Sequence, residues 1–351
     1  MYLDHNATSP MGSRVFEAVQ HATLEVFGNP SAMHARGRSA ASAVEKARDQ
    51  VGALVGRPSN HVYFTSGATE ANAWVLRGWT NPSRPVIAAS AVEHPSVKKW
   101  TTVEIPVTRD GLLDMDGFSR VMRANKGRVG VVSVMAANNE TGVMLQIEDA
   151  ARIARKAGAL FHCDATQMPG RCQIDIDADA ITLSAHKFGG PMGVGALVTA
   201  HVPTPLLRGG GQERGYRAGT LNLPGIVGMG VAAELAQTTM TSVLRDRLEV
   251  SLGSLPGEIV GQHAPRLPNT SCALFQVPGD MVLMALDMEG IQVSTGSACA
   301  SGAMKRSATL HAMGFDGIPV RFSFGAQTTD QDLDHLISTL PSILKRLEGV
   351  E

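Results

Sequence analysis

Several features are scarce in this 351-residue sequence, and each scarcity excludes a class of protein. The formal net charge is only −1, so the chain lacks the positive surface that binds nucleic acids or anionic lipids. No apolar run reaches the roughly 18 residues that a membrane-spanning helix needs. The four cysteines include no C-x-x-C spacing, which argues against a disulfide framework and a structural zinc site. We therefore expect no metal site and a reducing compartment.

The first residues of the chain and its composition agree with a globular protein in a reducing compartment. The first residues, MYLDHNATSP, carry Asp4 and lack the basic-then-apolar layout of a secretory signal. Hydrophobic residues make up 44% and charged residues 18%, which is ordinary globular composition. We find no fixed-period repeat and no low-complexity block. A cytoplasmic protein that binds neither nucleic acid nor membrane directly is expected.

Short apolar runs alternate with helical patterns between about residues 59 and 200. Residues 129–137 are continuously apolar and rich in valine, as strands buried on both faces are, and residues 146–159 have helical periodicity. This β-α-β order predicts a mostly parallel mixed sheet with helices on both faces. Further on, we expect one long helix over residues 232–255, and a last helix that is capped at Thr329 and kinked or ended by Pro341.

Polar side chains follow the ends of five predicted strands. Ligands bind beyond the carboxyl ends of parallel strands, so the five clusters predict a single pocket. The clusters are Thr65–Thr69, Glu93–His94, Asn138–Asn139, Asp164–Gln167 and Ser184–Lys187.

Three of these clusters have a specific chemical interpretation, each with a plainer alternative. Residues 65–70 (TSGATE) open a helix, whose free N–H groups bind phosphate well, or they form an ordinary capped turn. Lys187 follows an apolar strand and is a candidate imine former, or a surface lysine with only its stem buried. The carboxylate of Asp164 is partly desolvated and needs a cationic or donor partner, such as a protonated pyridine nitrogen, or it caps the following turn.

A phosphate cup, an imine-forming lysine and an aspartate for a ring nitrogen are the requirements of pyridoxal 5′-phosphate (PLP). The ordered motifs resemble those of the NifS/IscS-type cysteine desulfurases in the class V aminotransferase family, and the resemblance covers nearly the whole chain. The motifs are YLDHNATSP, SGATE, EHPS, NNETG, HCDATQ, SAHKFGGPMG, RAGT, STGSACASG and VRFSFGAQTT. The resemblance implies an α/β fold of the fold-type I PLP-dependent transferases. Residues 13–235 would form the large PLP-binding domain, and residues 1–12 and 236–351 a smaller α+β domain that carries the cysteine loop.

The resemblance also implies roles for individual residues. Lys187 would hold PLP covalently, and Asp164 would pair with the ring nitrogen. His94 would lie over the ring and shuttle a proton, and Gln167 would donate to the phenolic oxygen. The residues implied for the phosphate group are Ala68, Thr69, Ser184 and His186, together with Thr220 from the second subunit of a homodimer.

The substrate implied is L-cysteine, with its carboxylate held by Asn139 and Arg321. The planar fork of an arginine matches a carboxylate, although a structural salt bridge is the alternative for Arg321. Cys299 lies among small, polar residues, whereas free cysteines are usually buried. By resemblance its thiolate attacks the substrate sulfur, which leaves L-alanine and a persulfide for a sulfur-acceptor protein. A proton acceptor must assist the thiol, and His94 is one candidate.

Other functions remain open at this point. A selenocysteine lyase or another class V transaminase or lyase shares the fold, but a transaminase has no use for Cys299. A non-catalytic sulfur-carrier or scaffold subunit needs none of Lys187, Asp164 and Cys299. The sequence departs from the expected pattern at His5 and Ala185, and it ends soon after the last helix. In the family, housekeeping relatives carry a further tail that docks an iron–sulfur scaffold protein, and its absence favours a dedicated acceptor or a different sulfur pathway over that partner. Iron–sulfur cluster biogenesis, tRNA thiolation and molybdenum-cofactor synthesis all stay open as destinations of the sulfur.

Overall fold

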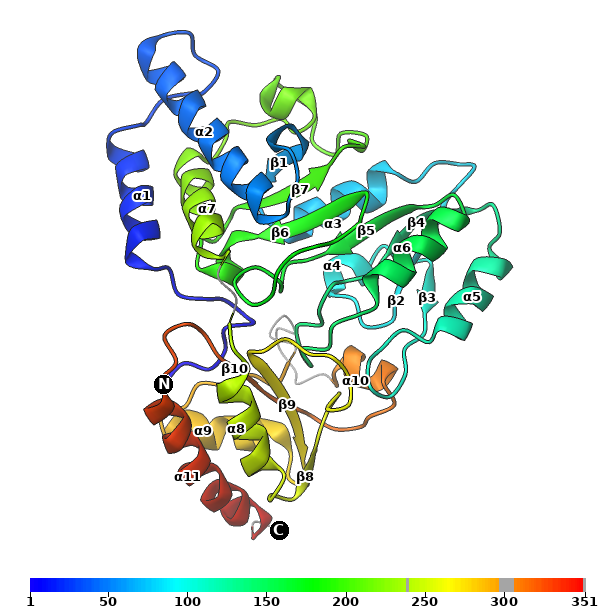
Figure 1. Cartoon of the computed structure of the whole chain (residues 1–351), viewed down its shortest axis with the longest axis vertical. Helices are drawn as coiled ribbons and strands as arrows, with labels where there is room; N and C mark the ends of the chain where they lie inside the picture. The colour runs from blue at the N-terminus through cyan, green and yellow to red at the C-terminus, as the bar shows by residue number, and fades with distance from the viewer. Residues whose placement is uncertain (238–239, 297–305, 350–351) are drawn as a thin grey trace.

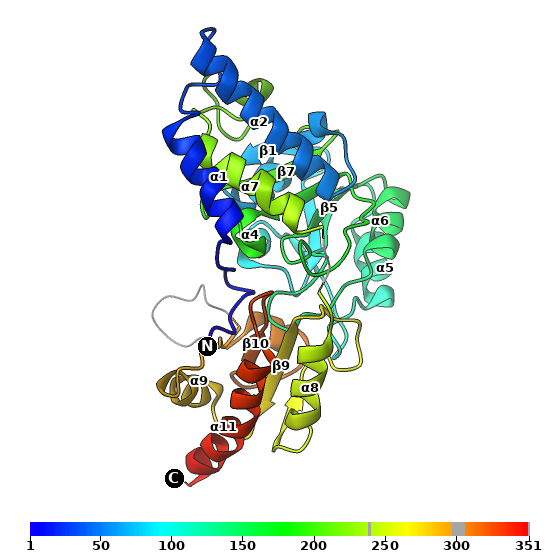
Figure 2. The same ribbon diagram turned by 60° about the vertical axis from the view of Figure 1, so that its left-hand side comes forward.

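The computed structural model describes residues 1–237, 240–296 and 306–349 of the chain. A seven-stranded sheet and a three-stranded sheet lie in opposite halves of the molecule (Figures 1 and 2). The large sheet contains β1 (Val62–Thr65), β2 (Val86–Ser90), β3 (Val103–Ile105), β4 (Val129–Ser133), β5 (Leu160–Asp164), β6 (Ala180–Ser184) and β7 (Gly195–Thr199). The small sheet contains β8 (Gly257–Ile259), β9 (Thr270–Phe275) and β10 (Val320–Ser323).

Helices surround both sheets. Those around the large sheet are α1 (Ser13–Leu24), α2 (Ala35–Leu54), α3 (Ala68–Gly78), α4 (Pro95–Lys98), α5 (Met115–Ala124), α6 (Ile147–Lys156) and α7 (Leu223–Leu235). Those near the small sheet are α8 (Val243–Leu252), α9 (Gly279–Met288), α10 (Ala308–Ala312) and α11 (Asp330–Glu348). Three short 3-10 turns are η1 (Ser59–His61), η2 (Ala185–Phe188) and η3 (Gln212–Gly215).

The large sheet has the strand order β1-β7-β6-β5-β4-β2-β3. Strands β6, β5, β4, β2 and β3 run parallel, whereas β7 is antiparallel to both of its neighbours, β1 and β6. Because β1 and β6 are both antiparallel to β7, they run parallel to each other. The carboxyl ends of β1, β2, β4, β5 and β6 therefore lie at one edge of the sheet. The predicted mostly parallel mixed sheet of an α/β fold is thereby confirmed.

Alternate side chains of the buried strands face two helix layers. Phe64 of β1 packs in the core that includes α2, α5, α6 and α7, while its neighbour Tyr63 packs with Trp74 of α3 on the other face. The rings of Tyr63 and Trp74 meet edge to face, with centroids 5.8 Å apart. Because both faces are covered, the strands are apolar at successive positions rather than at every second one.

A close approach of two backbones sets the spacing at the edge of the sheet. A Cβ atom at residue 195 would lie 2.6 Å from the Cα of Gly67 and 2.6 Å from the carbonyl oxygen of Leu183. Gly195 is also the register partner of both Thr65 and Ser184. The absence of a side chain at this glycine therefore lets the ends of β1 and β6 lie close together.

Two predictions about the second half of the chain need correction: residues 232–255 as one long helix, and Pro341 as the end of the last helix. Residues 232–255 do not form one helix, because α7 ends at Leu235 and α8 begins at Val243. The sequence between them is rich in threonine and serine, whose hydroxyls compete for backbone groups; the Ser242 hydroxyl donates to Asp246 in the first turn of α8, at 2.6 Å. Helix α11 begins with the predicted capping box at Thr329 but runs past Pro341 to Glu348.

The N-terminal segment lies between the two sheets (Figure 1). Tyr2 forms a β-bridge with Gln292, and Asp4 forms one with Ser323 of β10, while Leu3 is fully buried in the core of the small sheet. Further along this segment, the backbone N–H of Ser9 donates to the backbone carbonyl of His186, which lies in η2 at the edge of the large sheet, at 2.8 Å. In the described part of the chain, no helix is both long enough and apolar enough to cross a membrane.

Replacement of Gly195 tests the close approach of the two backbones. Gly195→Ala should lower the free energy of unfolding by about 1–3 kcal/mol, because backbone atoms cannot turn away from the new methyl group. Gly211→Ala is the matched control, since nothing lies within 4 Å of a Cβ at that position, and it should change stability by less than about 0.5 kcal/mol. Denaturant titration of the three proteins measures both values. Equal stability of the Gly195→Ala and Gly211→Ala variants would contradict the packing argument.

Candidate active site

The end of β5 holds a buried carboxylate with partners of its own. Asp164 is 4% exposed, and its two oxygens accept from the side-chain amide of Asn72, at 2.8 Å, and from the backbone N–H of Thr166, at 3.0 Å. Within the described residues, Asn72 Oδ1 and Thr166 Oγ1 are buried without a hydrogen-bond partner. Because buried polar atoms are normally hydrogen-bonded, these two atoms beside a buried carboxylate indicate a site that can bind a polar ligand.

His94 joins the same network from the loop that follows β2, two strands away from β5 in the sheet. It precedes α4, and its Nδ1 accepts from the backbone N–H of Ser96 at 3.1 Å and lies 2.8 Å from the Ser96 hydroxyl. The same hydroxyl accepts from Asn72 at 2.9 Å, so Ser96 and Asn72 connect His94 with Asp164. Burial lowers the pKa of His94, and the nearby charges of Asp164 and Lys187 act in opposite directions. The imidazole is therefore neutral at neutral pH.

Lys187 lies in η2, one turn beyond the end of β6. Its Nζ donates to the backbone carbonyls of Asn6, at 2.7 Å, and Ala7, at 2.8 Å. Its own carbonyl accepts from the Ser9 hydroxyl at 3.0 Å. The N-terminal segment thus holds both ends of this lysine.

Gln167 is oriented by a residue that the sequence analysis missed. The Gln167 side chain donates from Nε2 to the Asn6 carbonyl at 3.1 Å, and its Oε1 accepts from Arg171 at 2.6 Å. Arg171 also donates to the carbonyls of His5 and Lys187. Burial, and secondarily the charge of Arg321, lowers the pKa of Arg171 to about 10. Because Arg171 can only donate, it fixes Oε1 of Gln167 as the acceptor and Nε2 as the donor, and one N–H of that nitrogen bonds the Asn6 carbonyl.

The predicted phosphate residues meet where β1 and β6 end. Ala68 and Thr69 form the first turn of α3, whose N–H groups have no partners within the helix. Ser184 lies beside them, since a Cβ on Gly67 would be 3.8 Å from its hydroxyl. In the same turn, Glu70 is held by Arg217 through two hydrogen bonds of 2.8 and 3.0 Å, which offsets a negative charge next to an anion site.

Two other predicted phosphate residues are placed differently. His186 faces the N-terminal segment, where its Nδ1 lies 3.2 Å from the Thr8 hydroxyl. Burial and the charge of Lys187 lower its pKa to about 4, so it is neutral at physiological pH. Thr220 is exposed in the loop between η3 and α7, and its contact with a second subunit stays a prediction.

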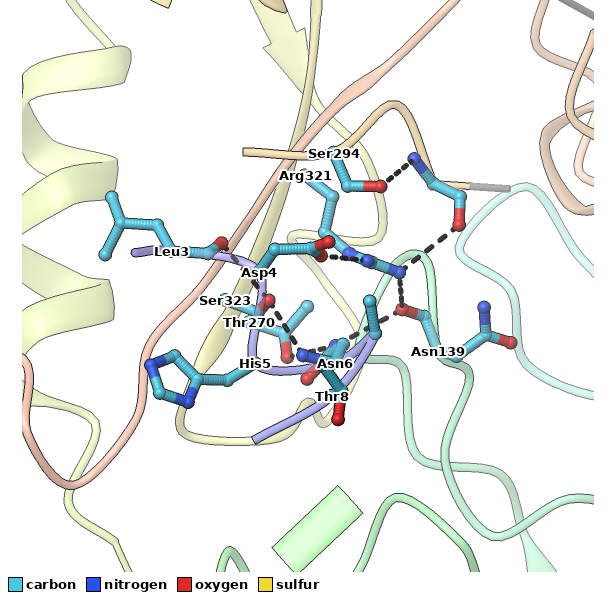
Figure 3. Close-up of polar contacts among 12 residues, drawn as sticks. Leu3, Asp4, His5, Asn6, Thr8, Asn139, Thr270, Ser294, Arg321 and Ser323 are labelled. Carbon is cyan, nitrogen blue, oxygen red and sulfur yellow. Dashed lines mark hydrogen bonds and ion pairs between the residues drawn. The ribbon is translucent and has the colours of Figure 1, made fainter. Parts of the chain in front are cut away.

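Arg321 and Asn139 do lie together, but the arginine has an additional partner (Figure 3). Arg321 is 1% exposed; its Nη2 forms an ion pair with Asp4. Its Nη1 donates to the backbone carbonyls of Asn139, at 2.8 Å, and Gly296, at 3.2 Å. Among the described residues, its Nε is buried without a partner. The salt bridge named as an alternative is therefore present.

Three of the four cysteines lie in the described residues, and all three are free thiols. Cys172 is half-buried, and burial raises the pKa of its thiol. Cys163 and Cys272 are buried in β5 and β9, and burial raises the pKa of Cys163 well above its usual value and that of Cys272 to about 12. Both thiols are therefore protonated and unreactive at neutral pH. Cys299, the predicted nucleophile, lies outside the described residues.

Several functional candidates lie outside the clusters first singled out: Asp4, Asn6, Asn72, Glu140 and Arg171. A signal was available for Asn72, which is four residues after Ala68 on α3 and so faces the same side of the helix. For the N-terminal residues no local signal exists, because their partners lie more than 100 positions away in the sequence.

Comparison with known proteins agrees with this geometry. The sequence matches the family Aminotransferase class-V over residues 1–336. The chain therefore belongs to the class V aminotransferase family, a PLP-dependent family, and its curated relatives are more specific in name. The cysteine desulfurase of Cereibacter sphaeroides is 43% identical over 100% of this chain and 97% of its own length. The cysteine desulfurase NifS of Azotobacter vinelandii is 38% identical over 100% of this chain and 94% of its own.

Solved structures extend the likeness to three dimensions. A NifS-like protein, 32% identical, superposes with a TM-score of 0.90 and covers 99% of this chain and 100% of its own. A structure described as SspA in complex with cysteine is 28% identical, with a TM-score of 0.81 and coverage of 92% and 98%. The resemblance drawn from the motifs and the expected fold of NifS-like PLP enzymes are confirmed.

Buried neutral histidines predict how stability varies with pH. The His162 ring is fully buried between Ser133 and Thr182, at 2.8 and 3.0 Å, and burial lowers its pKa to about 4. Between pH 4 and the unfolded pKa near 6.5, the unfolded chain binds the extra proton, so the free energy of unfolding rises with pH and the gain is complete above 6.5.

The variant His162→Asn should remove this contribution. Its free energy of unfolding should rise less steeply between pH 4.5 and 6.5, by at most about 1.4 kcal/mol per pH unit, which corresponds to one proton. Denaturant titrations at several pH values measure the two slopes. The wild-type slope also contains opposing groups such as Glu93, whose pKa burial raises to about 8, so the difference between the proteins is the informative quantity. Identical slopes would contradict the assignment.

Proposed function

We propose that this protein is a PLP-dependent cysteine desulfurase that converts L-cysteine to L-alanine and passes the sulfur to an acceptor. The observation that carries the proposal is the convergence of Lys187, Asp164 and His94 at one edge of the sheet. Asn72 and Ser96 connect Asp164 with His94, and the charges of both Asp164 and Lys187 act on the pKa of His94. Full-length relatives at 37–43% identity that are named cysteine desulfurase support the substrate.

The residues at this edge fit PLP in chemistry as well as in position. Asp164 is a buried carboxylate whose neighbours Asn72 and Thr166 each carry a polar atom without a partner in the described part of the chain, which suits a protonated ring nitrogen. Gln167 offers an amide donor for the phenolic oxygen, and the first turn of α3 with Ser184 offers N–H and O–H donors for the phosphate. When bound, PLP supplies an electron-accepting ring that makes the substrate's Cα–H and Cβ–S bonds breakable.

The chain's own residues handle protons around that ring. Lys187 takes and returns the proton on the substrate's Cα. His94 is neutral at neutral pH because burial lowers its pKa. A neutral imidazole can accept the proton of a thiol, whereas an imidazolium cannot. Asp164 is the partner of the ring nitrogen, and its oxygens are held by Asn72 and Thr166.

Sulfur transfer conserves atoms and electrons. The Cys299 thiolate forms an S–S bond to the substrate's Sγ while the Cβ–Sγ bond breaks. The electron pair of that bond stays on Cβ, which takes up a proton and becomes the methyl group of L-alanine. The redox change is internal to the reactants, because the transferred sulfur is oxidised to the sulfane level while Cβ is reduced. No external oxidant is required.

Arg321 and Asn139 bind the substrate carboxylate in this proposal. The guanidinium already has Asp4 and two carbonyls as partners. Its Nε has no hydrogen-bond partner among the described residues and is the group left for a carboxylate oxygen. The side-chain amide of the partly exposed Asn139 provides a second donor.

The finer assignments of assembly and cellular role belong to the same proposal. Thr220 completes the phosphate site of a second subunit in a homodimer. Its loop is anchored from within, because Arg48 forms two 2.8 Å hydrogen bonds with the buried Glu213, and Arg217 holds Glu70. The persulfide passes to a carrier or scaffold protein in the cytoplasm, with iron–sulfur cluster biogenesis as one destination.

Replacement of the nucleophile separates the two halves of the reaction. Cys299→Ala should bind PLP as the wild type does, because the cofactor contacts lie on the large sheet, yet it should lose sulfide release from L-cysteine by about 10³-fold or more. Absorbance of bound PLP and a sulfide assay with a thiol reductant measure the two properties. Cys163→Ala is the matched control, since that thiol is buried. Sulfide release by Cys299→Ala at the wild-type rate would contradict the nucleophile assignment.

A further inference from the structure

Glu140 lies where both flanks of the segment that carries Cys299 meet the large sheet. It follows β4 in the loop of residues 138–142 and is 7% exposed. Residues 297–305 are outside the described structure, but Gly296 immediately before them and Ser307 shortly after them both contact this one carboxylate. A single side chain therefore contacts the chain on either side of the segment.

The preceding flank packs against Glu140 without room for a side chain. Gly296 has a φ of +92°, and a Cβ there would lie 2.7 Å from Glu140 Oε2. Its N–H donates to the Ser294 hydroxyl at 3.3 Å and its carbonyl accepts from Arg321 at 3.2 Å (Figure 3). The position of Gly296 is thus fixed by Glu140, Ser294 and Arg321 together.

The following flank is hydrogen-bonded to the same carboxylate. The Ser307 hydroxyl donates to Glu140 Oε2 at 2.5 Å, and the Thr309 hydroxyl donates to Oε1 at 3.0 Å. Ser307 is also the N-cap of α10, because its Oγ accepts from the backbone N–H of Leu310 at 3.1 Å. The start of α10 is consequently fixed to Glu140 through two hydroxyls.

Glu140 is itself held rigidly to the edge of the large sheet. The side-chain oxygen of Asn138 accepts from the backbone N–H groups of Glu140 and Thr141, each at 2.9 Å, and its amide donates to the carbonyl of Val92 at 2.9 Å. Val92 is two residues before His94, and Asn139 is the neighbour of Glu140. The loop therefore places the anchor of the Cys299 segment beside the residue assigned to the substrate.

We propose that Glu140 is a positioning residue that fixes both flanks of the Cys299 segment relative to the substrate-binding loop. The inference rests on the proposed function for the role of Cys299. It goes beyond that function by naming what fixes the two flanks of the nucleophile's segment to the substrate-binding loop. Because misplacement of a reacting group by about 1 Å costs about 10²-fold in rate, such an anchor acts on turnover more than on binding.

Two readouts test the anchor in the PLP-loaded protein. The first is the rate at which iodoacetamide alkylates Cys299, followed by peptide mapping. Glu140→Ala removes both acceptors and should raise this rate by about fivefold or more, because the flanks are released. The second is kcat for sulfide release from L-cysteine, which should fall about tenfold or more. Exchange of the Cα proton of L-alanine in D₂O needs no Cys299 and should stay within about twofold.

Matched variants keep the test informative. Glu148→Ala is the control, since it removes an exposed carboxylate in the first turn of α6 and should leave all three readouts unchanged. Glu140→Gln keeps one acceptor and should fall between wild type and Glu140→Ala, and so should Thr309→Val, which removes one hydroxyl. If Glu140→Ala does not fold, these two variants carry the test.

Each result supports or overturns the inference. Alkylation of Cys299 at the wild-type rate in Glu140→Ala, or in the two milder variants, overturns it and leaves the proposed function intact. A loss of alanine exchange equal to the loss of sulfide release also overturns it, because Glu140 would then act on the whole site. If the wild type itself releases no sulfide, the proposed function fails, whereas the alkylation rates still measure the anchor.

Discussion

The site depends on the contact between Lys187 and the N-terminal segment. The lysine donates to the carbonyls of Asn6 and Ala7, and the Asn6 carbonyl also accepts from Gln167. Two residues earlier, Asp4 forms an ion pair with Arg321 in the small sheet. One short stretch of backbone, which turns after Asp4, therefore sets the proposed cofactor lysine in the large sheet against the proposed carboxylate-binding arginine in the small one.

Buried polar groups at this edge stabilise the arrangement only as a connected set. Transfer of a charged group out of water is costly unless it is paired or hydrogen-bonded, and Asp164, Arg321, Glu140 and Arg171 are all buried here. Each has hydrogen-bond partners from a different part of the chain. Loss of one partner leaves the other group buried and unpaired, so the network favours a single arrangement of the two sheets around the site.

The sequence was sufficient for the class of fold and for much of the site. Continuously apolar strands and the β-α-β order predicted the large sheet, and parallel strands carry their polar C-terminal residues to one edge, so Asp164, Ser184 and Lys187 could be grouped correctly. The contacts of Asp4, Asn6 and Glu140 could not be predicted, because they join residues far apart in the chain. The continuation of α11 past Pro341 depends on tertiary packing, which local propensity does not contain. Cys299 could be named from its motif alone.

The most direct test of the account is the location of the PLP linkage. Reduction of the PLP-loaded protein with borohydride fixes the cofactor to the amine that holds it, and peptide mapping by mass spectrometry identifies that residue. The account predicts a pyridoxyl label on Lys187 and no stable label in Lys187→Ala. A label on another lysine, or a purified protein that takes up no PLP when it is offered, would contradict it.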